Sequence, residues 1–319
     1  MTGVDGAAVS MRRSVYRGRV IDYVVGRGLR IVARVPHQWR IRVFASLYQA
    51  YLICSPRYRT IAEKNIALVF PERSVDARRE ILERSAESFG RMVSDVFRIS
   101  HLSQEWFHQQ VTIERQTELR AIVDAGPVLC LGGHIGSFDL MVAAFGAMIQ
   151  PIDFIVRENK ISSVEQWSTE LRTRSGNGVI PRSGGLRRIL GQIKKGRSVG
   201  FLFDQNVTRN HAIFVEWFGR LAATTVAPGF VAERVRCPVI IVWIRYIKDD
   251  CYTIRWQKLD ERAIYDSQLA PDQVREAVLR QAVEVLERAI REQPGDWFWL
   301  HRRWKTAPEG VAEDFYTKD

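Results

Sequence analysis

The stretch "PVLCLGGHIGSFDL", residues Pro127–Leu140, combines three local signals. Its first half, "PVLCL", is a short apolar run typical of a buried strand, and the glycine pair that follows is typical of a turn. Ser137 is a residue type that begins helices as an N-cap, and apolar residues follow it. The stretch therefore predicts a strand, a turn that contains His134, and a helix whose first turn contains Asp139.

The same alternation continues to the carboxyl terminus. Further strands are predicted at "IDFIV", "SVGFLF" and "PVIIVWI". Helices are predicted near Phe138–Met148, Ser163–Arg174, Leu186–Lys195 and Thr225–Arg236, and a late amphipathic helix at "DQVREAVLRQAVEVLERAIRE". Strands that alternate with helices predict an α/β fold: a central mixed sheet flanked by helices, with a helical amino-terminal extension.

Domain boundaries follow from changes in composition. We expect residues 1–11 to be disordered, residues 12–100 to form a helical, membrane-associated extension, and residues 101–319 to form one integrated catalytic α/β region. Within the extension, Ser74 is expected to cap the helical run "VDARREILERSAESFGRMVSDVF".

Charge and cysteine content restrict the class of partner. Lys and Arg outnumber Asp and Glu by 47 to 36, giving a net charge of +11, so the partner is expected to be an anionic lipid, a nucleic acid or an acidic carrier protein. The four cysteines are widely spaced and include no CxxC pair. This argues against a zinc site or a disulfide framework and favours a reducing, cytosolic environment. We expect no metal site.

Two apolar stretches precede the α/β region. "YRGRVIDYVVGRGLRIVARV" (Tyr16–Val35) interleaves arginines with aliphatic residues, and "WRIRVFASLYQAYLI" (Trp39–Ile53) follows it. Neither has the roughly 20 uncharged apolar residues of a membrane span, and no cleavable signal peptide is evident. Helices lying in an anionic headgroup layer and amphipathic helices packed on the core both remain open interpretations.

The spacing of His134 and Asp139 favours a chemical role. Five positions correspond to a rotation of about 140° on a continuous helix, so the two side chains converge only if the helix starts between them. The carboxylate is then expected to reach one imidazole nitrogen, while the other faces a crevice at the carboxyl end of the sheet. Such a pair makes histidine a general base. A histidine that merely caps the turn is the alternative.

His134 and Asp139 also form an HxxxxD motif that resembles that of the glycerolipid and lysophospholipid acyltransferases. The flanking sequence is similar to the lipid A biosynthesis acyltransferase family, the late lauroyl and myristoyl transferases. Five further stretches share this resemblance, which spans about Asn65 to Pro308: "NIALVFPERS", "FIVRENK", "FLFDQN", "AATTVAPGFVAER" and "DWFWLHRRWKT".

The resemblance implies a role for four residues. His134 would take a proton from an acceptor hydroxyl, Asp139 would orient His134, and the attacked atom would be an acyl thioester carbon. Arg157 would bind the oxyanion or an acceptor phosphate, although a solvated surface arginine is an alternative. Asp204 would support the same crevice or contact the acceptor, although an Asx turn is an alternative. No cofactor is expected beyond acyl carrier protein or coenzyme A thioesters as co-substrates.

The resemblance further implies a membrane glycolipid acceptor, such as a lipid A precursor, and attachment to the cytoplasmic face of the bacterial inner membrane. The arginine-rich helices differ from the more continuously hydrophobic start of many family members, so we expect peripheral or monotopic attachment. Another phospholipid or mannosylated phosphatidylinositol remains an alternative acceptor. A basic nucleic-acid-binding protein is disfavoured because no reading or stacking motif is found, and a serine hydrolase because GxSxG is absent.

Overall fold

The computed structural model describes residues 23–156, 159, 161–181, 184–311 and 315–316. A seven-stranded sheet at its centre has the order β1-β9-β8-β2-β5-β3-β4. Its strands are β1 (Val111–Ile113), β2 (Leu129–Gly132), β3 (Ile152–Val156), β4 (Gly178–Pro181), β5 (Ser198–Leu202), β8 (Val239–Tyr246) and β9 (Tyr252–Lys258). All neighbours pair in parallel except β8 and β9, so the sheet is mixed, and the predicted α/β fold class is confirmed.

Each apolar run that predicted a strand forms one, as β2, β3, β5 and β8. The prediction missed β1 and β4, which have only three and four residues. It also missed β9, whose burial alternates because one face is partly solvated, and the antiparallel hairpin of β6 (Ala212–Trp217) and β7 (Arg220–Thr225). Short and half-polar strands lack the continuous apolar run on which the prediction depended.

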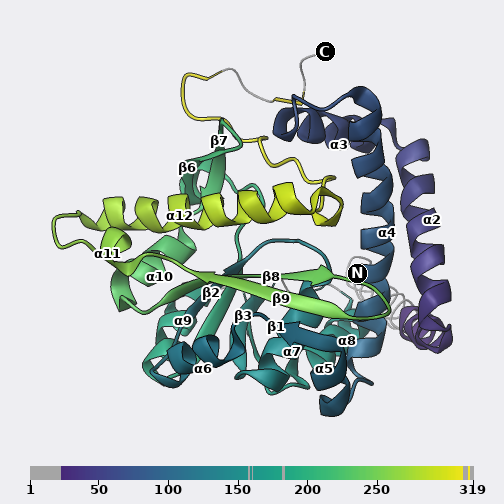
Figure 1. Cartoon of the computed structure of the whole chain (residues 1–319), viewed down its shortest axis with the longest axis horizontal. Coiled ribbons are helices and arrows are strands. Elements are labelled where there is room, and N and C mark those ends of the chain that lie inside the picture. The colour runs from purple at the N-terminus through teal and green to yellow at the C-terminus, as the bar shows by residue number, and fades with distance from the viewer. Residues whose placement is uncertain (1–22, 157–158, 160, 182–183, 312–314, 317–319) are drawn as a thin grey trace, which may run out of the picture.

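Helices cover both faces of the sheet (Figure 1). The named helices, which include those beside the sheet, are α2 (His37–Cys54), α3 (Pro56–Val69), α4 (Val75–Ile99), α5 (Gln104–Gln110), α6 (Gln116–Asp124), α7 (Phe138–Met148), α8 (Ser162–Thr173), α9 (Gly185–Lys194), α10 (Ala227–Val235), α11 (Glu261–Ile264) and α12 (Pro271–Glu292). Leu129 and Leu131 of β2 belong to the core beneath α12, whereas Cys130 belongs to the core beneath α7. Successive strand residues thus point to opposite faces, and two cores form.

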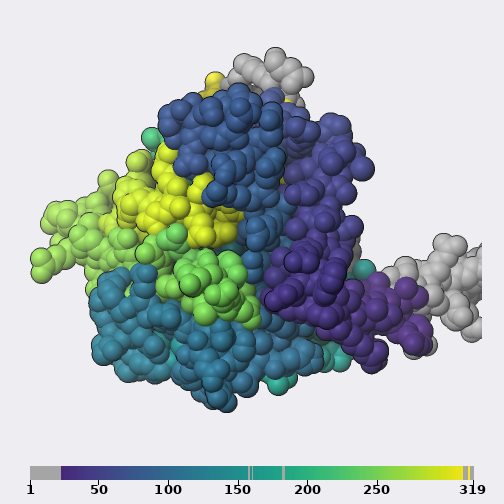
Figure 2. All heavy atoms as spheres, turned by 45° about the vertical axis from the view of Figure 1, so that its right-hand side comes forward, coloured from purple at the N-terminus to yellow at the C-terminus, as the bar shows by residue number. Residues whose placement is uncertain are grey.

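The helices before the sheet form a closely packed layer beside it. Ser74 caps α4 as predicted, with its Oγ accepting from the N–H of Ala77 at 3.2 Å. Helix α2 crosses α4 at Gly90, where an added Cβ would lie 2.4 Å from the carbonyl oxygen of Ile41. Only glycine therefore permits this crossing. In Figure 2, α2 lies on the outer surface of the molecule.

Arg40 connects this layer to the preceding helical segment, residues 23–34. Its guanidinium is buried and donates to the carbonyl oxygens of Ala33 and Val35 at 2.9 and 2.7 Å, and to Ser94 Oγ at 3.2 Å. No helix within the described ranges is both long and apolar enough to cross a membrane. The prediction of disorder for residues 1–11, and the arginines between Tyr16 and Asp22, lie outside the described residues.

Candidate active site

His134 lies in the turn between β2 and α7, as predicted. The turn is tight: Gly136 has a φ of +54°, and a Cβ there would lie 3.0 Å from the carbonyl oxygen of Ile244. Ser137, however, makes no capping hydrogen bond to α7. Its hydroxyl instead donates to the carboxylate of Asp95, a fully buried residue of α4 that also accepts from Tyr252 at 2.9 Å. The turn is therefore held by α4 and β9 as well as by local structure.

The carboxylate of Asp204 orients the imidazole ring. Its Oδ1 lies 2.7 Å from Nδ1 of His134, and its Oδ2 accepts from the backbone N–H of His134 at 2.8 Å and from Nε1 of Trp297 at 2.9 Å. Asp204 is 2% exposed and lies two residues after the end of β5. Because β5 is the parallel neighbour of β2, with Gly132 opposite Leu202, the two residues meet at the carboxyl edge of the sheet.

Asp139 does not make the contact expected of it. Its Oδ1 pairs with Nε of Arg172 in α8 at 3.5 Å, and Asp204, not Asp139, contacts an imidazole nitrogen, Nδ1. The helical rotation after Ser137 directs Asp139 toward α8, whereas the end of β5 lies directly beside the histidine turn. Asp139 nevertheless lines the same cavity as His134.

The charges of the site determine its protonation state. Burial disfavours the imidazolium, but the charge and hydrogen bond of Asp204, together with the charge of Asp139, outweigh it and raise the pKa of His134. Burial opposes ionisation of Asp204, yet His134 and the other donors lower its pKa to about 2. An ionised carboxylate can only accept hydrogen bonds, so in the neutral ring Nδ1 carries the hydrogen and Nε2 presents a lone pair.

That lone pair faces a cavity of about 1080 Å³. The side-chain amide nitrogen of Gln205 lies 3.3 Å from Nε2, in the place that a hydroxyl donor would take. The cavity continues between the sheet and the helices, where its walls are apolar: Met141, Val142, Phe145, Ile152, Phe154 and Val242. A polar mouth and an apolar interior suit an amphiphilic substrate.

The carboxyl-terminal segment holds the Asp204–Asn206 loop in place. Nε2 of His301 accepts from the backbone N–H of Asn206 at 2.6 Å, and burial, reinforced by the nearby charge of Arg303, lowers the pKa of His301 to about 4. The side-chain amide of Asn206 pairs in both directions with Thr306, at 3.0 and 3.1 Å. These contacts explain the position of Asp204 better than an isolated Asx turn does.

Thr224 and Thr225, the threonine pair before α10, have different roles. Thr224 is fully buried and accepts from Trp217 Nε1 at 3.1 Å, and Arg303 donates to it as well, so Thr224 does not cap the helix. The hydroxyl of Thr225 accepts from the N–H of Ala227 at 3.4 Å, at the start of α10.

Arg157 lies outside the described residues, so its role stays a prediction. The sequence analysis missed three members of the site: Arg172, which pairs with Asp139, Gln205, which approaches His134, and Trp297, which donates to Asp204. Gln205 and Trp297 stand inside stretches that carry the family resemblance, whereas Arg172 is an ordinary helical arginine in the sequence. Across the described ranges, no group of three His, Cys, Asp or Glu side chains is placed to hold a metal ion.

Comparison with known proteins identifies the family of this chain. Residues 10–306 match the family described as "Bacterial lipid A biosynthesis acyltransferase". The chain is 26% identical to the lipid A biosynthesis palmitoleoyltransferase of Escherichia coli (strain K12), over 80% of this chain and 81% of that protein. It is 25% identical to the lauroyltransferase of the same organism, over 89% and 91%, and 23% identical to its myristoyltransferase, over 90% and 88%. The chain therefore belongs to the bacterial lipid A biosynthesis acyltransferase family and is an acyltransferase.

Proposed function

We propose that the protein is an O-acyltransferase that moves a fatty acyl chain from an acyl thioester to a hydroxyl of a lipid A precursor or related glycolipid, with His134 as general base. One observation carries the proposal: Asp204 accepts from both the ring and the backbone of His134, and the Nε2 lone pair faces a cavity with apolar walls. A base fixed in this tautomer can take a proton without rearranging.

The reaction would proceed by addition and elimination. Nε2 of His134 takes the proton of the acceptor hydroxyl as its oxygen attacks the thioester carbonyl carbon. The resulting tetrahedral intermediate collapses when the carbon–sulfur bond breaks, and the imidazolium returns its proton to the departing thiolate. Asp204 stabilises the imidazolium formed between these two steps, because its charge lies 2.7 Å from the ring.

Charge also develops on the thioester oxygen. The side-chain amide of Gln205 is a donor 3.3 Å from Nε2, and its displacement by the acceptor hydroxyl would leave it free to bind the oxyanion. Arg157 is proposed for the oxyanion or for an acceptor phosphate. Asp139 is proposed as a second carboxylate that supports His134. Its charge raises the pKa of the imidazole, and its ion pair with Arg172 holds it near the ring.

The donor is proposed to be acyl carrier protein or coenzyme A carrying the acyl chain. The apolar interior of the cavity, between β2, β3 and α7, would take that chain. Another phospholipid or mannosylated phosphatidylinositol remains the alternative acceptor.

We also propose peripheral or monotopic attachment to the cytoplasmic face of the bacterial inner membrane. In α2, Trp39, Val43, Leu47 and Tyr51 recur every four residues, and each is 43–59% exposed. Residues four apart lie on one helical face, so they form an apolar stripe that we call the α2 stripe. An exposed apolar stripe on a basic protein is what binding to an anionic bilayer requires.

The deciding experiment is lipid mass spectrometry of cells with the wild-type gene, without it, and with a His134→Ala variant. Loss of one acyl chain from a glycolipid in the last two strains, restored by the wild type alone, would identify the acceptor and the chain length. An unchanged lipid profile, with the His134→Ala protein folded and present, would refute the proposed reaction.

A further inference from the structure

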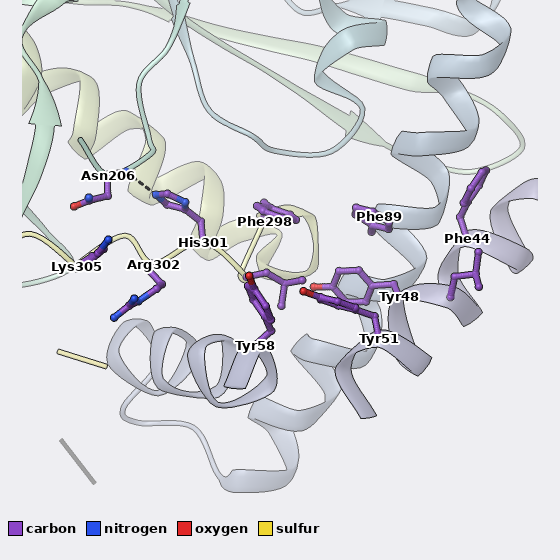
Figure 3. Close-up of a pocket in the computed structure, with 12 residues that line it drawn as sticks. Phe44, Tyr48, Tyr51, Tyr58, Phe89, Asn206, Phe298, His301, Arg302 and Lys305 are labelled. Carbon is purple, nitrogen blue, oxygen red and sulfur yellow. Dashed lines mark hydrogen bonds between the residues drawn. The ribbon is translucent and has the colours of Figure 1, made fainter. Parts of the chain in front are cut away.

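A second cavity, of about 740 Å³, opens beside the one that contains His134. It lies between α2, α3, α4 and the carboxyl-terminal segment, and we call it the α2 groove (Figure 3). Its lining residues are Phe44, Leu47, Tyr48, Tyr51, Tyr58, Phe89, Asn206, Phe298, Leu300, His301, Arg302 and Lys305. Asn206 and His301 hold the Asp204 loop, but none of the side chains of this groove takes part in the proposed chemical steps.

One end of the groove is aromatic and open to the surface. Tyr48 packs against Phe89 with ring centroids 4.9 Å apart, and Tyr51 against Tyr58 at 5.3 Å. Leu47, 58% exposed, and Tyr51, 43% exposed, belong both to this end and to the α2 stripe. An amphiphile leaving a bilayer that contacts the stripe would thus meet an apolar wall without crossing water.

The other end is cationic. Figure 3 shows Arg302 and Lys305 at the end of the groove where Asn206 and His301 lie. Lys305 is exposed, and in the described part of the chain no carboxylate forms an ion pair with it. His301 adds no charge near neutral pH, because burial lowers its pKa to about 4. This end therefore complements an anionic group such as a phosphate.

Asn206 lines both cavities and follows Gln205, whose amide approaches Nε2 of His134. The cationic end of the α2 groove is thus the end nearest to the proposed base. A molecule lying along the groove would place its apolar part against the aromatic end and its polar part toward the reaction.

We propose that the α2 groove is the docking site of the acceptor lipid, and that Lys305, at the cationic end, binds a phosphate group of that lipid. That the bound lipid is the acceptor rests on the proposed acyltransferase function. That the groove binds a phosphorylated amphiphile rests on its own lining residues. The donor's acyl chain is proposed to occupy the other cavity, which His134 lines. The two substrates would then occupy adjoining cavities and meet at one base, as a bimolecular transfer requires.

Binding of a small phosphorylated amphiphile tests the groove directly. Dodecyl phosphate and dodecyl maltoside, each below its critical micelle concentration, would be titrated into the full-length His134→Ala protein by calorimetry. Dodecyl phosphate is expected to bind more tightly, and Lys305→Gln is expected to weaken it about three- to fivefold, as for an exposed charge pair. The variant should leave dodecyl maltoside unaffected.

Matched controls separate the groove from general charge and hydrophobicity. Lys195→Gln removes an exposed lysine at the end of α9, outside both cavities, and should not change either Kd. Leu47→Gln should weaken both probes, whereas Ile53→Gln, on the same helix, 72% exposed and outside the lining, should weaken neither.

The outcomes are distinct from those of the catalytic proposal, because the His134→Ala protein transfers no proton. Equal affinity for the two probes, or equal effects of Lys305→Gln and Lys195→Gln, would overturn the phosphate assignment. Equal effects of Leu47→Gln and Ile53→Gln would overturn the groove as the binding site. If binding depends on the phosphate but the lipid profile is unchanged in cells without the gene, the proposed acyl transfer is refuted. The groove would still be supported as a binding site for phosphorylated amphiphiles.

Discussion

The ring of His134 is held by Asp204, seventy positions further along the chain, with Nδ1 and Oδ1 2.7 Å apart. The sheet order makes this contact possible, because β2 and β5 are parallel neighbours that end side by side. Trp297, from the carboxyl-terminal segment, donates to the same carboxylate and fixes its orientation. The proposed base thus depends on three segments of the chain.

Asp204→Asn is expected to lower kcat/KM about 100- to 10,000-fold, because the amide cannot stabilise the imidazolium. The base must be neutral, so wild-type activity should fall as the pH drops through the raised pKa of His134. Without the charge of Asp204, that pKa falls and the acidic limb of the pH–rate profile should move to lower pH. A profile measured on the folded variant with an unmoved limb would contradict the role of Asp204.

Asp139→Asn is expected to reduce activity about tenfold or more and to move the acidic limb in the same direction by a smaller amount. Its charge also raises the pKa of His134, but Asp204 contributes more and bonds to the ring directly. Rates of acyl transfer and pH profiles of the two asparagine variants, measured side by side, would test the order. A larger shift for Asp139→Asn would make Asp139 the principal partner.

Gly133→Ala is expected to impair activity about tenfold while the protein remains folded. A Cβ at this position would lie 3.1 Å from Oδ2 of Asp204 and 2.8 Å from Leu286 Cδ2, so the carboxylate must shift. A small displacement of a catalytic group lowers the reaction rate strongly. Gly191→Ala on α9 is the control, since its Cβ would meet nothing within 4 Å. Equal activities of the two variants would show that Asp204 tolerates the displacement.

Gly90→Ala is expected to lower the free energy of unfolding by about 1–3 kcal/mol, the usual cost of overpacking. The added Cβ would meet the α2 backbone, 2.4 Å from Ile41 O and 2.8 Å from Ala45 N, and backbone atoms cannot move aside cheaply. Gly28→Ala, where a Cβ meets nothing within 4 Å, should be neutral or mildly stabilising. Urea unfolding of both variants checks the difference, and equal midpoints would show that α2 is not packed this closely.

Sedimentation with vesicles tests attachment to the bilayer. Binding is expected to be tighter to anionic than to neutral vesicles, because each basic residue near the surface adds about 1 kcal/mol, and to weaken in high salt without vanishing. A double variant, Trp39→Gln with Val43→Gln, should reduce binding about tenfold, since it removes two exposed apolar anchors. Val75→Gln, at an even more exposed position (64%) at the start of α4, is the control. Equal binding to both vesicle types would leave the membrane assignment without support.

The sequence by itself determined the α/β class, the four apolar strands and the strand–turn–helix unit that presents His134. These features depend on local periodicity and turn chemistry, which neighbouring residues specify. It did not reveal β9 or the β6–β7 hairpin. The strands of both mix buried and partly exposed residues, so they lack the continuous apolar run that predicts a buried strand.

The partner of the histidine was decided only by the tertiary structure. The motif places Asp139 five positions from His134, and sequence proximity made it the expected contact, but a helix that starts between them directs Asp139 toward Arg172. Sheet order brings Asp204 to Nδ1 instead, and Trp297 and the Asn206–His301 contact hold it there. Sheet order and inter-segment hydrogen bonds arise from packing across the whole chain, so a local motif cannot specify them.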